Sequence, residues 1–277
     1  MFLFRMAVLI ITSFMTAQTA FADSPAPLPN SFVATGDKNI AQAWLANPTT
    51  RYQHFVLGDD YEASSLVAKT SDGKIAVYDL PDFLVFEDRY VRIADLDNDG
   101  VDEMVVVMSS VSEGASLAVL AMDGDAIELI TRTPPIGLPF RWLNPAGIAD
   151  FDGDGTLEIA LVEKPHLSKQ VQFWRMNQRE MSLVATLDGF SNHRNGSRHQ
   201  GMSAIADVDN DGVDDLIIPT SDRKGLAVIS LALQAEVLDT YSLPKALDGN
   251  IELQQSSNGI VVSVQYQNGE RSDVRLD

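Results

Sequence analysis

The sequence contains no cysteine among its 277 residues, so disulfide bonds cannot hold the chain together. It has only four histidines, and it lacks the HExxH, GxSxG and P-loop patterns of common catalytic sites. Basic side chains are also scarce: 20 Lys and Arg stand against 39 Asp and Glu, giving a formal charge of −19. Such acidity argues against nucleic acid, or an anionic membrane, as a partner for the whole surface.

Long apolar runs are missing after residue 22, where no segment approaches the roughly 18 consecutive apolar residues of a membrane helix. Residues 1–22 have one charge, Arg5, then an apolar stretch and the small-x-small ending Ala20-Phe21-Ala22. This pattern is typical of a secretory signal peptide, and no cysteine follows the cleavage site to take a lipid anchor. We therefore expect an exported protein, periplasmic or secreted, without insertion in a membrane.

One acidic pattern occurs three times and organises the rest of the chain. Its copies are DLDNDGVDE at 95–103, DFDGDGTLE at 150–158 and DVDNDGVDD at 207–215, each preceded by Ile-Ala and followed by an apolar run. Their starts are 55 and 57 residues apart, which is the length of a supersecondary unit. Such a period indicates a propeller or a solenoid.

Each copy has the residue types of a calcium loop. Aspartates at positions one, three and five supply hard anionic oxygens, glycine at position six permits the turn, and position nine adds a carboxylate. Position twelve is apolar in all three copies, where an EF-hand has a bidentate glutamate, so the EF-hand is excluded. Identical ligand spacing in three copies also argues against ordinary Asp-Gly turns. The expected side-chain ligands are Asp95, Asp97, Asp99, Glu103, Asp150, Asp152, Asp154, Glu158, Asp207, Asp209, Asp211 and Asp215, with the backbone carbonyls of Val101, Thr156 and Val213.

Loops of the form DxDxDGxx(D/E) before an apolar strand resemble the FG-GAP/VCBS repeats of integrin-alpha-type β-propellers. The resemblance covers the three loops and, through weaker repeats, about residues 50–277, although the FG-GAP words themselves are absent. It implies an all-β propeller with Ca²⁺, three ions in this chain, in the loops between the first and second strands of its blades. Members of this family are mostly binding or scaffold modules and include a minority of enzymes.

Residues 51–277 fit a propeller domain of about five four-stranded blades. First strands are expected to end at Leu57, Ala94, Ala149, Ala206 and Leu247. The acidic loop is complete in the middle three blades, degenerate at 58–62 in the first, and reduced to Asp248-Gly249-Asn250 in the fifth. Alternating apolar runs and turn residues support the outer hairpins. Residues 23–50 form a lead-in that contains, at 38–46, either a short helix or a strand that closes the last blade.

Two connections are longer than a blade requires, and the alternation of connections in a meander places both on the face opposite the acidic loops. They are 133–145, which has four prolines and an aromatic pair, and 189–200, which is rich in His and Arg. If the blades bring them together, they form a concave site with cationic donors and aromatic walls. The expected ligand-binding residues are Arg141, Trp142, His166, His193, Arg194, Arg198 and His199. For Trp142, packing between blades is the open alternative.

The sequence thus predicts an exported, calcium-binding β-propeller that acts as a non-catalytic binding or scaffold module for a protein or glycan partner. The calcium would be structural, because close carboxylates repel one another until a cation binds. The alternative is a calcium-dependent lyase or hydrolase for an acidic polysaccharide or phosphoester. In that case His193, His199, Arg194 and Arg198 would act beside an exposed ion.

Overall fold

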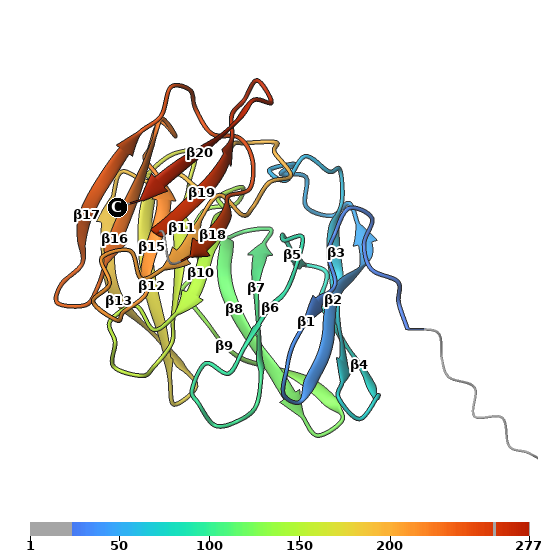
Figure 1. Ribbon diagram of the computed structural model, residues 1–277. Helices are drawn as coiled ribbons and strands as arrows, with labels where there is room; N and C mark the ends of the chain where they lie inside the picture. Colours follow the sequence, from blue (N-terminus) through green and yellow to red (C-terminus); the bar gives the residue numbers. More distant parts are fainter. Residues whose placement is uncertain (1–23, 257–258, 277) are drawn as a thin grey trace, which may run out of the picture.

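The computed structural model describes residues 24–256 and 259–276, and the predicted signal peptide lies outside these residues. All regular elements in this part of the chain are β-strands, and every pairing between them is antiparallel (Figure 1). No helix in the same residues is long and apolar enough to cross a membrane. The strands form one sheet of nine, two of four and one of three. The prediction of an all-β fold is confirmed.

The nine-stranded sheet contains two meanders joined by a short strand. Strands β1 to β4 pair in chain order, as do β6 to β9, and β5 lies between β3 and β7. The bounds are β1 (Ala34–Thr35), β2 (Ile40–Thr49), β3 (Glu62–Thr70), β4 (Ile75–Asp79), β5 (Leu84–Phe86), β6 (Arg92–Ala94), β7 (Glu103–Ser110), β8 (Gly114–Asp123) and β9 (Ala126–Arg132).

The other three sheets are simple meanders in chain order. The second sheet is β10 (Leu143–Ala149), β11 (Glu158–Glu163), β12 (Gln170–Asn177) and β13 (Glu180–Asp188). The third is β14 (Ala204–Ala206), β15 (Asp215–Pro219), β16 (Gly225–Ser230) and β17 (Glu236–Ser242). The last is β18 (Glu252–Ser256), β19 (Gly259–Gln265) and β20 (Arg271–Leu276).

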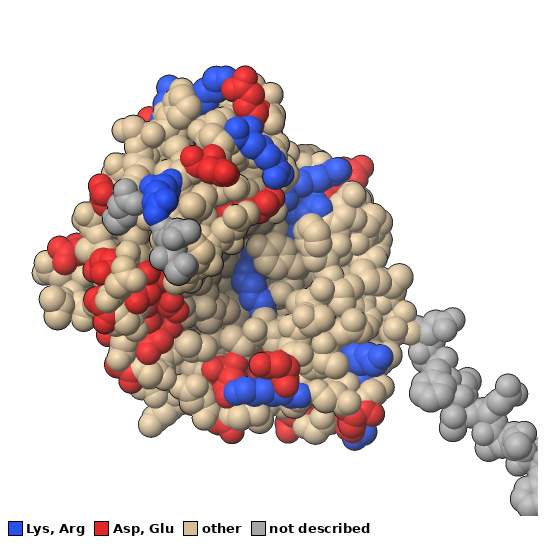
Figure 2. Space-filling view, viewed as in Figure 1, with Lys and Arg blue, Asp and Glu red and all other residues tan. Residues whose placement is uncertain are grey.

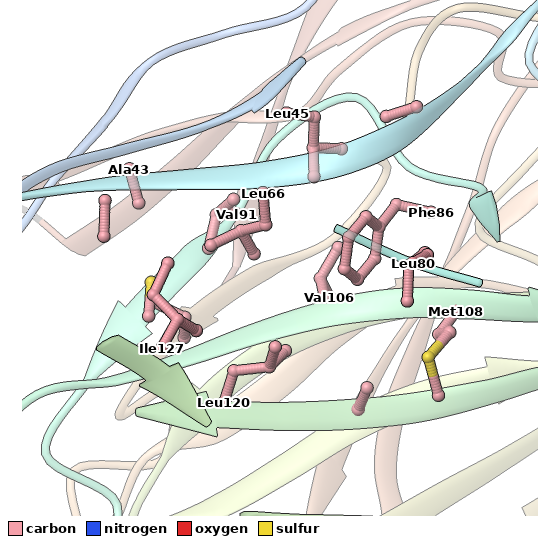
Figure 3. Packing of buried hydrophobic residues seen from close by; sticks show 14 of the residues in the cluster. Ala43, Leu45, Leu66, Leu80, Phe86, Val91, Val106, Met108, Leu120 and Ile127 are labelled. Atoms are coloured by element: carbon pink, nitrogen blue, oxygen red, sulfur yellow. The ribbon is translucent and has the colours of Figure 1, made fainter. Parts of the chain in front are cut away.

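Apolar side chains stack successive meanders face to face. Side chains alternate between the two faces of a strand, so in β7 Val106 points to β2 and β3 whereas Val105 points to β10 and β11. Figure 3 shows the first of these interfaces, where Leu45 and Leu66 meet Val106 and Leu120. Two further clusters repeat the arrangement between the second and third sheets and between the third and last sheets. The core is therefore a series of layers between neighbouring meanders.

The first meander begins earlier in the chain than the sequence suggested. Residues 38–46 contain no helix; they lie mostly in β2, which pairs with β1 and β3 rather than with the last sheet. Residues 52–57 form no strand and belong to the β2–β3 connection, so the predicted first strand ending at Leu57 is wrong. The run is apolar because Tyr52, Val56 and Leu57 are buried within that connection.

The three complete acidic loops lie where the sequence placed them, in the connections β6–β7, β10–β11 and β14–β15. The degenerate loop at 58–62 lies instead at the opposite strand ends, where Asp59 pairs with Arg89 at 2.8 Å and Arg198 at 2.6 Å. Asp59 thus serves two ion pairs, and the segment does not form a fourth copy of the loop. Leu247 forms only an isolated bridge, with Tyr266, so the last sheet lacks the predicted first strand at this point.

The short first strands of the meanders surround a cavity. Residues of β1, β6 and β10 line a space of about 400 Å³, and the Arg92 side chain is among its walls. The space-filling view shows a hollow near the middle of one face, with basic side chains inside it and acidic side chains gathered along one margin (Figure 2). Charge is thus distributed unevenly over this surface.

Candidate functional site

The three acidic loops share one backbone conformation. In each loop the amide of position six donates to the first aspartate at 2.8–3.0 Å, and the amide of position seven to the fifth-position aspartate at 2.8–2.9 Å. The amide of position two donates to the position-nine carboxylate at 2.8–2.9 Å. Positions four and six have positive φ in every copy, which suits Asn or Gly at four and Gly at six. The repeated sequence therefore produces a repeated local fold.

This conformation gathers carboxylates tightly enough to hold a metal ion. In each loop three carboxylate oxygens from different side chains lie within 4.8 Å of one another. The three groups are Asp95, Asp97 and Asp99; Asp150, Asp152 and Glu158; and Asp207, Asp209 and Asp215. An oxygen-only donor set of this kind favours hard cations. The carbonyls of Val101, Thr156 and Val213 remain predicted ligands.

Two of the loops contain a buried carboxylate oxygen that accepts no hydrogen bond: Asp95 Oδ1 in the first and Asp215 Oδ1 in the third. Such an atom is costly, and a bound cation would give it a partner. Burial, together with the charges of neighbouring aspartates, raises the pKa of Asp215 to about 6 and that of Glu103 to about 7. The residues present therefore fit a divalent cation in these two loops.

The second loop has a different electrostatic arrangement. Arg175 of β12 donates from Nη2 to Asp152 at 2.7 Å, from Nη1 to Asp154 at 2.9 Å, and from Nε to Glu158 at 2.6 Å. In the first loop a cation of another kind, the Lys38 ammonium, contacts Asp95 from the β1–β2 connection. The three loops thus share their backbone but differ in the charges that surround them.

A second candidate site lies at the other ends of the strands. Four connections converge there on a cavity of about 190 Å³. Its walls are His54 from β2–β3; Phe140, Arg141 and Trp142 from β9–β10; Lys164, His166 and Leu167 from β11–β12; and Asn195 from β13–β14. Strand β11 separates the two sites, because Glu158 at its start closes an acidic loop and Lys164 follows its last residue. Six residues of strand correspond to about 20 Å.

Trp142 forms a buried part of the cavity wall and is only 2% exposed. Its indole Nε1 donates to the Glu87 carbonyl at 2.9 Å. Its ring lies 4.7 Å from the His193 ring and 6.5 Å from that of His166, between centroids. Packing, the alternative left open for this residue, is what the structure shows. The exposed aromatic ring at the cavity is that of Phe140.

A histidine pair behind the cavity has a defined protonation pattern. His193 Nε2 lies 2.9 Å from the Ser197 carbonyl oxygen, which can only accept, so this nitrogen carries the hydrogen. His166 Nε2 then donates to His193 Nδ1 at 3.0 Å. Burial lowers the pKa of His193 to about 3 and that of His166 to about 4, which keeps both rings neutral near pH 7. His166 Nδ1 is therefore an unprotonated acceptor.

His54 is held by a fully buried carboxylate. Its Nδ1 lies 2.6 Å from Glu87 Oε1, and the Ser109 hydroxyl donates to Glu87 Oε2 at 2.5 Å. Burial raises the pKa of Glu87, and the hydrogen bonds from His54 and Ser109 oppose that rise. These contacts fix the orientation of the imidazole that lines the cavity.

The rim of the cavity is backbone-strained. Phe140 and Phe55, the residue after His54, are 45% and 46% exposed and have φ values of 54° and 56°. Lys164 has a φ of 47°. Bulky residues seldom adopt such angles, and strain of this kind concentrates at functional sites. Phe140 is held in place by Tyr52, whose hydroxyl accepts its amide hydrogen at 2.7 Å and whose ring stacks on it at 5.1 Å.

The structure brings together only some of the predicted ligand-binding residues. Arg141, Trp142 and His166 line the cavity, and His193 lies behind them. Arg194 instead pairs with Asp248 at 2.7 Å, and Arg198 pairs with Asp59. His199 is half-buried and is not among the residues that line this cavity. The predicted residues did not include His54, Glu87, Phe140, Lys164 or Asn195. Phe140 and Asn195 lie in the two connections predicted to form the site, whereas His54, Glu87 and Lys164 join them only through folding.

Antiparallel meanders, three of which have an acidic loop before their second strand, define a repeat protein of the β-propeller class. Residues 95–161 match the model of the FG-GAP-like repeat family, and this segment contains the first two acidic loops. The chain therefore carries an FG-GAP-like repeat, which confirms the resemblance in its sequence. A search of curated proteins gave no match.

Several solved structures resemble the fold. The rhamnogalacturonan lyase YesW is 16% identical with a TM-score of 0.47, and the match covers 91% of this chain and 52% of that one. A rhamnogalacturonan lyase from Bacillus licheniformis is 13% identical, with a TM-score of 0.46 and coverages of 91% and 51%. A putative 6-phosphogluconolactonase from Bacteroides fragilis is 12% identical, with a TM-score of 0.44 and coverages of 88% and 70%. The chain spans about half the length of the two lyases, and these identities are too low to assign an activity.

Proposed function

We propose that this chain is an exported, five-bladed β-propeller that binds Ca²⁺ in its acidic loops and acts as a non-catalytic binding module. The five blades would be β1–β4, β6–β9, β10–β13, β14–β17 and β18–β20, each a meander whose neighbours pack on its faces. Export rests on the pattern of residues 1–22. Mass spectrometry of the exported protein should find Asp23 as its first residue, and retention of Met1 would refute export by cleavage.

The calcium ions would stabilise the fold rather than contact a ligand. Support comes from the all-oxygen donor set and from the buried, unpartnered oxygens of Asp95 and Asp215. The ion would supply the positive charge that lets those carboxylates stay ionised together. At a free concentration ten times Kd, each bound ion adds about 1.4 kcal/mol to the free energy of unfolding.

The ligand that best suits the cavity is an acidic saccharide. Arg141 and Lys164 supply positive charge for a carboxylate, and Lys164 also pairs with Glu163 at 2.7 Å. The neutral His166 offers Nδ1 to a sugar hydroxyl, and the exposed ring of Phe140 can lie against the apolar face of a sugar. A concavity of about 190 Å³ admits a saccharide unit, whereas a protein partner needs a broader surface. The observation that carries this proposal is the His166 acceptor in one cavity with Arg141 and Phe140.

Calorimetric titration with acidic and neutral oligosaccharides of equal length tests the proposal. Arg141→Ala should weaken binding of an oligouronate about tenfold or more, because a charge-assisted hydrogen bond is lost. Arg271→Ala is the matched control, since this exposed arginine pairs with Glu252 in the last sheet. The proposal fails if neutral and acidic sugars bind equally or if Arg141→Ala binds as wild type does.

One observation favours a second function, the cleavage of an acidic polysaccharide by β-elimination. An unprotonated His166 Nδ1 near two cations could remove the proton next to a uronate carboxylate. The electron pair left behind would form the C4–C5 double bond and break the C4–O bond, and the departing oxygen would take a proton from water. The acidic loops lie at the far ends of the strands, on the face that the sequence predicts for them, so this chemistry would not use their calcium and would differ from the calcium-dependent lyase considered as the alternative. His166→Gln should then abolish formation of the unsaturated product while retaining binding, whereas a pure binding module forms no product in wild type.

A further inference from the structure

The second acidic loop differs from the others in the residue that faces its carboxylates from the next strand. The position-nine carboxylate pairs across the sheet with Ala121 in the first repeat and with Arg175 in the second. In the third repeat, the register of β15 and β16 places Ser230 at this point. Two repeats therefore have a small side chain where one has a long cation.

Arg175 contacts three of the four carboxylates that were predicted as ligands in the second loop. Its nitrogens lie 2.6–2.9 Å from oxygens of Glu158, Asp152 and Asp154. A guanidinium has five N–H donors in a planar fork, so one side chain can satisfy several carboxylates at once. The Arg175 side chain is 19% exposed and that of Glu158 is fully buried. Separating this pair would leave a buried charge without a partner, which is strongly unfavourable.

The first and third loops still need a cation. Asp95 Oδ1 and Asp215 Oδ1 are buried without a partner, whereas among the described residues no carboxylate oxygen of the second loop is in that state. Lys38 does not replace a metal in the first loop, because its ammonium contacts Asp95 Oδ2 and leaves Oδ1 unpaired. The Lys38 side chain is also 38% exposed and flexible, so it can move aside.

We propose that the second loop is a metal-free copy in which the Arg175 guanidinium takes the place of Ca²⁺, so that the chain binds two calcium ions. This rests on the proposed calcium role of the first and third loops. An ion in the second loop would have to displace Arg175 from three carboxylates, or lie within a few ångströms of its positive charge. The second loop leads into β11, and Arg175 belongs to β12. The connection between these two strands contains the cavity residues Lys164 and His166. The pocket strands are thereby held together without calcium.

The number of bound ions tests the role of Arg175. The purified protein is stripped with chelator, titrated with CaCl₂ in a calorimeter, and analysed for bound calcium after gel filtration. Wild type should bind two ions and Arg175→Ala three, because the vacated carboxylates can then take a metal. The control Arg271→Ala also removes an arginine paired across a sheet, with Glu252, and should still bind two.

Loop-specific substitutions decide the matter if Arg175→Ala fails to fold. Asp152→Asn should leave two ions bound, whereas Asp209→Asn, at the same position of the third loop, should lose one. Three ions in wild type, or the loss of an ion in Asp152→Asn, would overturn the proposal. If the wild type binds no calcium and Arg175→Ala binds one ion, calcium binding by the first and third loops is refuted. The role of Arg175 in the second loop would still be supported. No ion in either protein would overturn both.

Discussion

Asp215 and His193 are both fully buried, yet burial moves their pKa values in opposite directions. It raises the pKa of Asp215 to about 6 and lowers that of His193 to about 3, because a low dielectric disfavours whichever form is charged. A cation beside this carboxylate would favour its ionised form and oppose that rise. The imidazole loses its charge and becomes a neutral link between Ser197 and His166.

The histidine pair predicts a loss of stability at low pH. Its folded pKa values, about 3 and about 4, lie below the ordinary value of 6.5, so the unfolded chain binds more protons as pH falls from about 6.5 to 4. Each histidine should lower the free energy of unfolding by up to about 1.4 kcal/mol per pH unit in that window. Electrostatic contributions from nearby His54, Arg223, Lys169 and Arg194 are part of the cause of these low pKa values, after burial. Above pH 7 the contribution is constant.

Melting curves at a series of pH values check this prediction. His166→Gln keeps a side-chain amide to donate to His193 but removes one titrating group, so its melting temperature should fall less steeply between pH 6.5 and 4. His199→Gln is the control, because His199 takes no part in the hydrogen bonds of this pair. An unchanged slope in His166→Gln would contradict the neutral assignment of this ring.

At the scale of one element, the acidic loop shows why a repeat can vary at a single position. Position four has positive φ in all three copies and is Asn98, Gly153 and Asn210. A Cβ atom on Gly153 would lie 2.8 Å from a methyl group of Val213 in the neighbouring loop. The loops also contact each other through Asn98, whose side-chain amide donates to the Gly155 carbonyl at 2.7 Å. Packing between neighbouring loops therefore decides which residue each copy can hold.

Gly153→Asn should destabilise the protein although asparagine stands at this position in both other loops. The backbone angle suits asparagine, so the cost comes from the contact with Val213 and should be about 1–3 kcal/mol. The reverse change, Asn210→Gly, creates no clash and should cost less than about 1 kcal/mol. Urea unfolding of both variants at saturating calcium measures the difference, and equal stabilities would show that the loops do not pack as described.

The acidic loops could be predicted from sequence because their ligands, turn residues and following strands lie within a few consecutive positions. The first meander could not be predicted, because the apolar run at 52–57 resembles a strand. Its residues are instead buried within the connection between β2 and β3. The cavity near His166 could be predicted only in part. Arg141 and His166 were predicted because they lie in connections between strands that the repeat pattern locates. His54 and Glu87 meet across 33 residues of chain, and no local pattern indicates that contact.

Across the whole molecule, the two kinds of site lie at opposite ends of the same strands. The acidic loops join first strands to second strands, and the pocket is built from the connections at the other ends. Layers of apolar side chains between the meanders separate them. A change at the loops can therefore reach the pocket only through the stability of the sheets.

This separation predicts that calcium controls the stability of the protein without controlling ligand binding. Removal of calcium by chelator should lower the melting temperature by several degrees, because two loops lose the cation that joins their carboxylates. At a temperature where the stripped protein stays folded, its affinity for an oligouronate should remain within about twofold of the calcium-loaded value.

The most direct test measures both quantities on one preparation, by thermal unfolding and by calorimetric titration, with and without chelator. The account predicts a lower melting temperature together with unchanged affinity. An unchanged melting temperature, or loss of oligouronate binding by a stripped protein that is still folded, would contradict it.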